Sequence, residues 1–166
     1  TEEGYFETSV WKHAKNRIVW LLILMLSAAI TGNILAQYEA AFAVAPLLVA
    51  FIPMIMGTGG NCGSQSSTLI IRGLATDEIK LKDIFRVIWK EIRVAFIVGV
   101  ALAIVNAIRV IIQYRDIQLA IVLGITLIVT TIISKVLGCV LPMLAKRLKL
   151  DPAIMAAPLI TTLVDV

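Results

Sequence analysis

The sequence predicts an all-α integral membrane protein with five transmembrane helices. Of its 166 residues, 60% are hydrophobic and only 16% are charged. A soluble domain of this size would be about half apolar and about a quarter charged. The charges gather in clusters, and the apolar runs between them approach the roughly 20 helical residues that cross a bilayer. The class is therefore integral membrane.

The apolar runs predict where the spans lie. We expect them at about residues 18–38, 41–71, 94–112, 119–145 and 152–166. The second run is long for one crossing. The fifth is short, because about 15 helical residues rise only about 22 Å, so we expect the natural helix to continue beyond Val166. Asp151 suits the N-cap of this last helix, and Pro152 suits its first turn.

The basic residues predict the orientation. They precede the first span and fill the connections between spans two and three and between spans four and five. The set is Lys12, Lys15, Arg17, Arg72, Lys80, Lys82, Arg86, Lys90, Arg93, Lys146, Arg147 and Lys149. Cytoplasmic loops carry the excess of Lys and Arg, so we expect a multi-pass protein of the cell inner (plasma) membrane. Its N-terminus would be cytoplasmic and its C-terminus outward. This pattern explains the net charge of +4 without a nucleic-acid partner.

Two segments lie outside the expected spans. Residues 1–17 would form a cytoplasmic lead-in to a transmembrane domain at 18–166, and their acidic start is unlike a signal peptide. Within about 76–93, apolar residues recur at roughly helical spacing after a possible N-cap at Thr76. This pattern predicts a cytoplasmic amphipathic helix along the inner membrane face. A stiff connector is the alternative.

The second expected span contains an unusually polar stretch, GTGGNCGSQSST at 57–68. Polar groups are costly in hydrocarbon, so such exceptions indicate function. A glycine-rich break here would let backbone carbonyls face a water-filled path.

Helical spacing places part of this stretch on one face. The members are Gly57, Gly60, Asn61, Ser64 and Thr68. Such a face offers neutral oxygens to a passing ion. The alternative is a close helix contact of the GxxxG kind, for which Gly59 and Gly63 have the spacing. The pore interpretation and the packing interpretation are compatible if the helix contact surrounds a pore.

Asp165 is the only acidic residue inside any expected span. It lies about 20 Å along its helix from the inner surface. A bound cation would remove the cost of burying its carboxylate. Thr161 lies one turn earlier on the same face. The alternatives are an aspartate near the outer headgroups or one hydrogen-bonded across a helix contact.

The donor set predicts the ion. Oxygen ligands without a His or Cys cluster favour a hard cation such as Mg²⁺, Ca²⁺ or Mn²⁺. One carboxylate per chain suits an ion that keeps most of its water, and Mg²⁺ loses water most reluctantly. Weak binding is also what conduction requires. No nucleophile motif or second acidic partner suggests an enzyme.

Five other residues have side chains that could bind a metal or carry charge near the membrane. We expect Cys62 and Cys139 to be buried thiols, Arg109 to snorkel outward, and His13 to be interfacial. Lys135 lies deep in the fourth span, where pairing with a carboxylate and lining a cavity are both open.

The string GTGGNCGSQ at 57–65 resembles the signature of the MgtE family of magnesium channels. The resemblance extends along nearly the whole chain, through Arg17, Gly138 and Pro142 to Asp151 and Pro152. It implies a homodimer in membrane lipid, with five spans per subunit and a pore on the two-fold axis. Spans two and five would line this pore, and hydrated Mg²⁺ would lie near Asp165 of both chains. The implied pore-facing set is Gly57, Gly60, Ser64, Thr68, Thr161 and Asp165.

The chain departs from the family pattern at three positions. Ser64 and Ala157 stand where some members have Asn, and Lys135 replaces a neutral polar residue. Family members usually carry a cytoplasmic Mg²⁺-sensing region with CBS domains, which is not visible in this sequence. We expect a passive Mg²⁺ channel that also accepts Mn²⁺, Ca²⁺ or Co²⁺. The alternatives are a proton- or Na⁺-coupled divalent cation exchanger and a non-transporting membrane assembly subunit.

Overall fold

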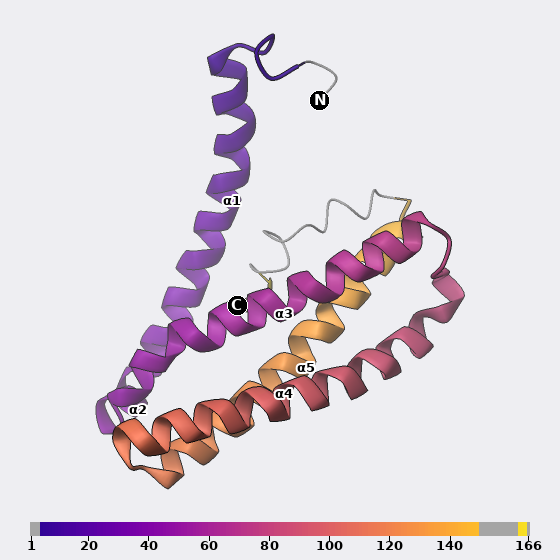
Figure 1. Ribbon diagram of the computed structural model, residues 1–166. Coiled ribbons are helices and arrows are strands. Elements are labelled where there is room, and N and C mark those ends of the chain that lie inside the picture. Colours follow the sequence, from indigo (N-terminus) through magenta and orange to yellow (C-terminus); the bar gives the residue numbers. More distant parts are fainter. Residues whose placement is uncertain (1–3, 150–162, 166) are drawn as a thin grey trace.

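The computed structural model describes residues 4–149 and 163–165, and the regular elements of that part are all helical (Figure 1). The elements are α1 (Val10–Gln37), α2 (Glu39–Val44), α3 (Leu47–Ala75), the 3₁₀ turn η1 (Leu81–Asp83), α4 (Ile84–Tyr114) and α5 (Ile117–Arg147). Within the described part, four helical stretches are long and apolar enough to cross a membrane: α1, α3, η1 with α4, and α5. The all-helical membrane class is therefore confirmed. Most of the fifth expected span, including Asp151 and Pro152, lies outside the described residues.

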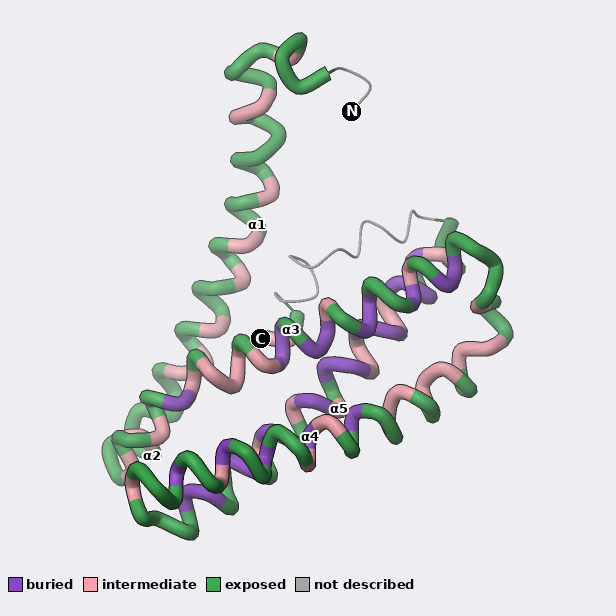
Figure 2. Tube along the Cα trace, viewed as in Figure 1, coloured by how far each residue is buried: buried purple, intermediate pink, exposed green. Residues whose placement is uncertain are grey.

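Helix α1 stands apart from the other long helices over most of its length (Figure 1). It begins earlier than expected because the Ser9 hydroxyl accepts the Lys12 N–H at 3.2 Å, which caps its first turn. None of its residues is buried (Figure 2). Because the described chain buries none of its residues, the apolar surface of α1 is available to contact lipid or another subunit.

The second expected span is divided in two. The short helix α2 ends at Val44, and α3 begins after Pro46, whose ring removes a backbone donor there. Beyond that point α3 continues without interruption through 57–68, so a glycine-rich break in this helix is wrong. Close packing of Gly59 and Gly63 against α5 offsets their low helix propensity.

The segment 76–93, expected as one amphipathic helix, is also divided. Thr76 ends α3 instead of starting a helix, and its hydroxyl donates to the Arg72 carbonyl at 3.1 Å. Asp77 then adopts a left-handed conformation with φ of 58°, and the Ile79 N–H returns to the Gly73 carbonyl at 3.0 Å. Residues 84–93 form the first turns of α4, which continues unbroken to Tyr114.

Helix α5 is the centre of the bundle and packs against both α3 and α4. Two apolar clusters hold the three helices together. One contains Phe51, Val110, Leu119, Ala120 and Leu123, and the other contains Ile70, Leu74, Cys139 and Met143. Between these clusters the helices meet through small residues, which brings the polar stretch of α3 close to α5.

Candidate functional site

Helix α3 has two faces of opposite character (Figure 2). Its buried side includes Gly59, Cys62, Gly63, Ser66, Ser67 and Ile70. Of the predicted pore face, Gly57, Asn61 and Thr68 are exposed and Ser64 is half-buried, whereas Gly60 is buried. The Thr68 hydroxyl donates to the Ser64 carbonyl at 2.9 Å, so this hydroxyl has a hydrogen-bond partner within the helix. Four of the five predicted residues therefore share a side that α5 leaves open.

The buried side of α3 makes the small-residue contact that the Gly59 and Gly63 spacing predicts. A Cβ built on Gly59 would lie 3.1 Å from Thr130 Cγ2 and 3.2 Å from Ser134 Oγ. A Cβ built on Gly138 of α5 would meet the Gly63 carbonyl oxygen directly. The packing interpretation and an open polar face thus occur on the same helix, on different sides.

Asp165 lies in the short described helical segment 163–165 beside α3. Its neighbour Val164 reaches 2.7 Å from the Cβ built on Gly59, and its own backbone carbonyl accepts the Thr31 hydroxyl of α1 at 3.5 Å. Its carboxylate Oδ1 is buried and has no hydrogen-bond partner in the described part of the chain. The structure thus places Asp165 close to the polar stretch. Thr161 and Ala157 lie outside the described residues.

A second unpartnered oxygen lies at the same level. Ser134 Oγ of α5 is buried and, within the described residues, has no hydrogen-bond partner. Buried polar atoms are nearly always satisfied by protein, water or an ion. Ser134 Oγ lies 3.2 Å from the Cβ built on Gly59, and Asp165 follows Val164, which contacts the same position.

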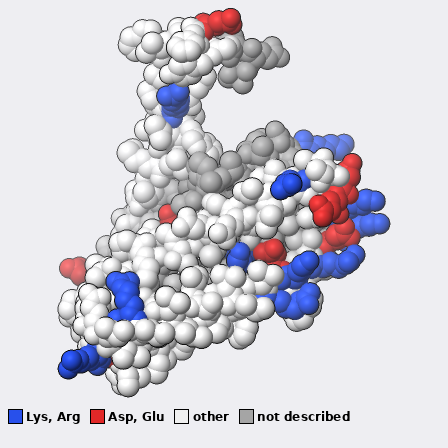
Figure 3. Space-filling view, viewed as in Figure 1, with Lys and Arg blue, Asp and Glu red and all other residues white. Residues whose placement is uncertain are grey.

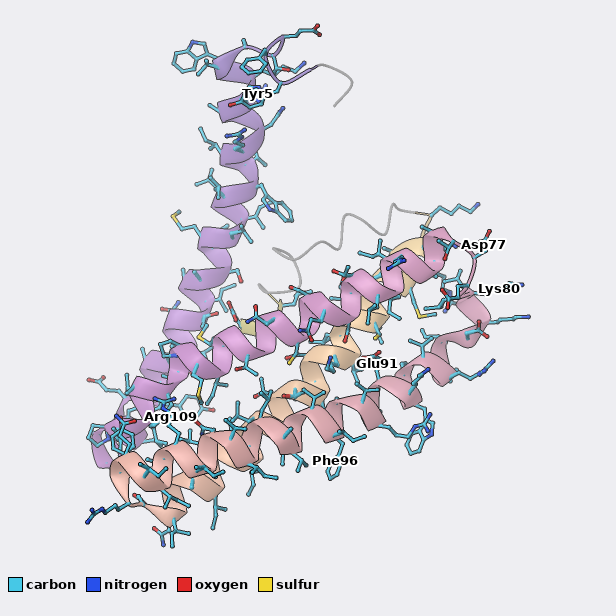
Figure 4. All side chains as sticks on the ribbon, viewed as in Figure 1. Tyr5, Asp77, Lys80, Glu91, Phe96 and Arg109 are labelled. Atoms are coloured by element: carbon cyan, nitrogen blue, oxygen red, sulfur yellow. The ribbon has the colours of Figure 1, made fainter. Side chains whose placement is uncertain are left out.

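Another polar cluster joins all three bundle helices and was not predicted. Ser66 of α3 donates its hydroxyl to Glu91 Oε2 of α4 at 2.9 Å. In Figure 4, Glu91 points from α4 toward α3 and α5, whereas Phe96 points away. Cys139 lies within electrostatic reach of both Glu91 and Lys135, and Lys135 is only 5% exposed. The buried lysine therefore lies near a carboxylate that the sequence alone assigned to a surface helix.

The remaining predicted positions are ordinary. Arg109 is exposed and lies along α3, with Nη1 3.8 Å from Met54 Sδ and the guanidinium 5.8 Å from the Phe51 ring centre. His13 Nε2 is 2.9 Å from the Tyr5 carbonyl oxygen near the start of α1. Both cysteines are buried and free, as expected. Among the described residues, no group of three or more His, Cys, Asp or Glu side chains could hold a metal ion.

Residues 52–166, more than half of the chain, match the sequence profile of the family described as "MgtE: Divalent cation transporter". The chain belongs to this family. The resemblance inferred from residues 57–65 is therefore confirmed. A member of this transporter family is not an enzyme, which agrees with the absence of a nucleophile motif.

Three curated relatives carry the name "Magnesium transporter MgtE". The protein of Bacillus subtilis is 37% identical over 97% of this chain, and that of Thermus thermophilus is 38% identical over 90%. The protein of Enterococcus faecalis is 31% identical over 93%. The matched regions cover 36%, 33% and 34% of these relatives, so this MgtE-family chain spans about a third of their length.

Proposed function

We propose that this chain is the membrane part of a Mg²⁺ channel that carries Mg²⁺ into the cytoplasm. Two subunits would form a homodimer, and α3 and the fifth span of each would line a pore on the two-fold axis. Mn²⁺, Ca²⁺ and Co²⁺ are further hydrated cations that such a pore would accept. The observation that carries this proposal is the polar side of α3 that no other described helix covers.

The cost of exposing this side to lipid supports a water-filled path. Asn61 is exposed in the middle of a helix long enough to cross the membrane. An amide without a hydrogen-bond partner in hydrocarbon costs several kcal/mol, on the order of 2–7. Water in a pore removes that cost. Beside it, a Cβ built on Gly57 would meet no described atom within 4 Å, which leaves room for a hydrated ion.

A second subunit would complete the path. A single chain leaves Gly57, Asn61 and Thr68 exposed and Ser64 half-buried along one line of α3. Two such lines facing each other across a two-fold axis enclose polar surface from both sides, while α1, none of whose residues is buried, remains for lipid or the partner. The close contacts of Gly59 and Gly63 with α5 hold α3 in place behind the pore.

The oxygen donors of Asp165 and of the open side of α3 fit a hard, hydrated cation. Asp165 contributes one carboxylate per subunit, and Asn61 contributes a neutral oxygen from the open side of α3. Such weak oxygen ligation suits Mg²⁺ that retains its water and must leave again. The names of the three relatives supply the same ion independently.

The charge distribution supports inward flow. The ends of α3 and α5 and the start of α4 meet at one end of the bundle, where Lys and Arg gather (Figure 3). We assign this end to the cytoplasm, because cytoplasmic segments carry the excess of Lys and Arg. A membrane potential that is negative inside would then drive the divalent cation inward without a coupled ion.

The test is Mg²⁺ uptake by the Asp165→Ala variant in proteoliposomes. We expect uptake to fall at least tenfold while chemical cross-linking still yields the dimer, because only the carboxylate is removed. Asp116→Asn, which changes an aspartate in the α4–α5 connection, is the matched control and should transport as the wild type. Unaltered uptake by Asp165→Ala would remove the carboxylate from the mechanism.

A flux measurement with and without a proton or Na⁺ gradient separates a channel from an exchanger. A channel responds to the imposed membrane potential, and its flux is indifferent to either gradient at constant potential. Flux that requires one of the gradients would establish the coupled exchanger instead. Wild-type dimer without any flux would favour the assembly subunit.

A further inference from the structure

A groove of about 980 Å³ lies between the end of α3 and the start of α4. It is separate from the polar side of α3 discussed above, and it lies at the end of the bundle that we assign to the cytoplasm (Figures 3 and 4). Four of its lining residues are cations: Arg72, Arg86, Lys90 and Arg93. Its acidic residues are Glu78, Asp83 and Glu91.

Two of the three acids are engaged within the protein. Asp83 Oδ2 accepts the Lys80 backbone N–H at 3.2 Å, and its Oδ1 lies 3.9 Å from Arg86 Nη1. Glu91 accepts the Ser66 hydroxyl at 2.9 Å and shares its surroundings with the buried Lys135.

The remaining charges of the groove are predominantly positive. Glu78 is left with Arg72, Lys90 and Arg93, all of which are exposed. The Arg93 guanidinium lies 5.6 Å from the centre of the Trp89 ring, a cation–π distance that orients it over the aromatic face. The groove therefore favours an anion over a cation.

The apolar residues of the groove indicate its depth in the membrane. Trp89 and Leu69 both line it, and each is 60% exposed. Tryptophan prefers the headgroup layer of a membrane, and an exposed leucine on α3 provides an apolar surface beside it. A ligand of this groove would thus have an anionic head at the interface and an apolar body directed into the bilayer.

We propose that this groove binds the headgroup of an anionic glycerophospholipid of the leaflet on that side. The phosphodiester would lie near Arg72 and Lys90, and an acyl chain would run over Leu69 and Trp89. Basic pockets between membrane helices on the cytoplasmic side have the charge and position for such headgroups. A bound lipid would hold the α3–α4 corner, next to the hydrogen bond between Ser66 and Glu91.

Native mass spectrometry of the purified, delipidated protein tests this proposal. Phosphatidylglycerol and phosphatidylcholine are added in equal amounts, and the lipid retained on the protein is measured. The wild type should retain the anionic lipid at least fivefold over the zwitterionic one. Each cation near a membrane surface contributes about fivefold to the attraction, so Arg72→Gln with Lys90→Gln should abolish that preference.

Two matched variants control for general charge effects. Arg115→Gln removes a cation from the α4–α5 connection at the other end of the bundle, and Lys82→Gln removes one nearby that does not line the groove. Both should retain the wild-type preference. Equal retention of the two lipids by the wild type would overturn the proposal. An unchanged lipid preference in the double variant would also overturn the proposal. This is the result expected if the groove binds a cytoplasmic polypeptide segment and the lipid binds elsewhere.

Discussion

The contact between α5 and α3 at Gly138 predicts a specific loss of stability on adding one methyl group. In the Gly138→Ala variant, the new Cβ would meet the Gly63 carbonyl oxygen and would lie 3.1 Å from its carbon and 3.2 Å from its Cα. Carbon atoms pack at about 3.5–4.0 Å. All three opposing atoms belong to the backbone, so no side-chain rotation relieves the contact and the two helices must move apart.

The magnitude follows from two opposing effects. Overpacking a well-packed interior costs about 1–3 kcal/mol, and a backbone obstacle places this case near the upper end. Replacing a helical glycine by alanine returns about 1 kcal/mol of helix propensity. The net loss is therefore about 2 kcal/mol, which lowers the melting temperature by about 4–8 °C for a chain of this size.

The assay is thermal unfolding in detergent, followed through tryptophan fluorescence. Gly32→Ala on α1 is the matched control, because a Cβ there would meet no described atom within 4 Å. This variant has the same change in helix propensity without the contact and should keep or raise the melting temperature. If Gly138→Ala proves as stable as Gly32→Ala, the close approach of α5 to α3 does not exist in the folded protein.

Three further substitutions test other parts of the structure. Ser66→Ala removes the hydrogen bond to Glu91 and should lower the free energy of unfolding by about 1.5–3 kcal/mol. The control Ser64→Ala should change it by less than about 0.5 kcal/mol. Thermal unfolding of both variants measures the difference. Asn61→Leu should block Mg²⁺ uptake in proteoliposomes with the dimer intact, and normal uptake would indicate a side that faces lipid. Asp116→Ala removes the N-cap of α5 and should cost about 1 kcal/mol in the same unfolding measurement, so an unchanged midpoint would mean that the cap contributes nothing.

The helices α4 and α5 show how far apolar patterning leads. Their expected membrane-crossing portions, 94–112 and 119–145, lie inside the observed helices, because continuous apolar residues between charged clusters have few other structures in a membrane. The observed helices extend two residues beyond these portions at both ends of α5 and at the end of α4, and α4 begins ten residues earlier, at Ile84. Those ends depend on caps such as Asp116, whose side chain accepts the Leu119 N–H at 3.1 Å.

The segment around Thr76 shows where local patterns mislead. Threonine followed by two acidic residues is typical of a helix start, yet here it ends α3. The deciding contact is between Ile79 and Gly73, where a Cβ on the glycine would lie 2.5 Å from Ile79 Cδ1. The chain folds back at this point because glycine leaves space for the isoleucine, and a local N-cap pattern does not reveal that contact.

For the candidate site, the structure bears on the arrangement of the predicted residues around α3. Of the five residues that helical spacing grouped, Gly57, Asn61, Ser64 and Thr68 lie on one side of α3, and their role in a pore stays a prediction. Gly60 lies on the boundary and is buried. The environment of Lys135 required the fold, because Glu91 is far away in sequence and comes near Cys139, on the same helix as Lys135, only through the packing of α4 on α5.

Substitutions on the two sides of α3 should have different effects, depending on which side of the helix the residue lies. On the side toward α5, glycine spacing limits the volume of each residue, so changes there act on whether the protein assembles. On the other side, neighbours are absent from the described chain, so larger residues fit, and under the proposed function changes there act on transport. Sensitivity in assembly and sensitivity in transport should therefore follow the same helical period, displaced from each other by about half a turn.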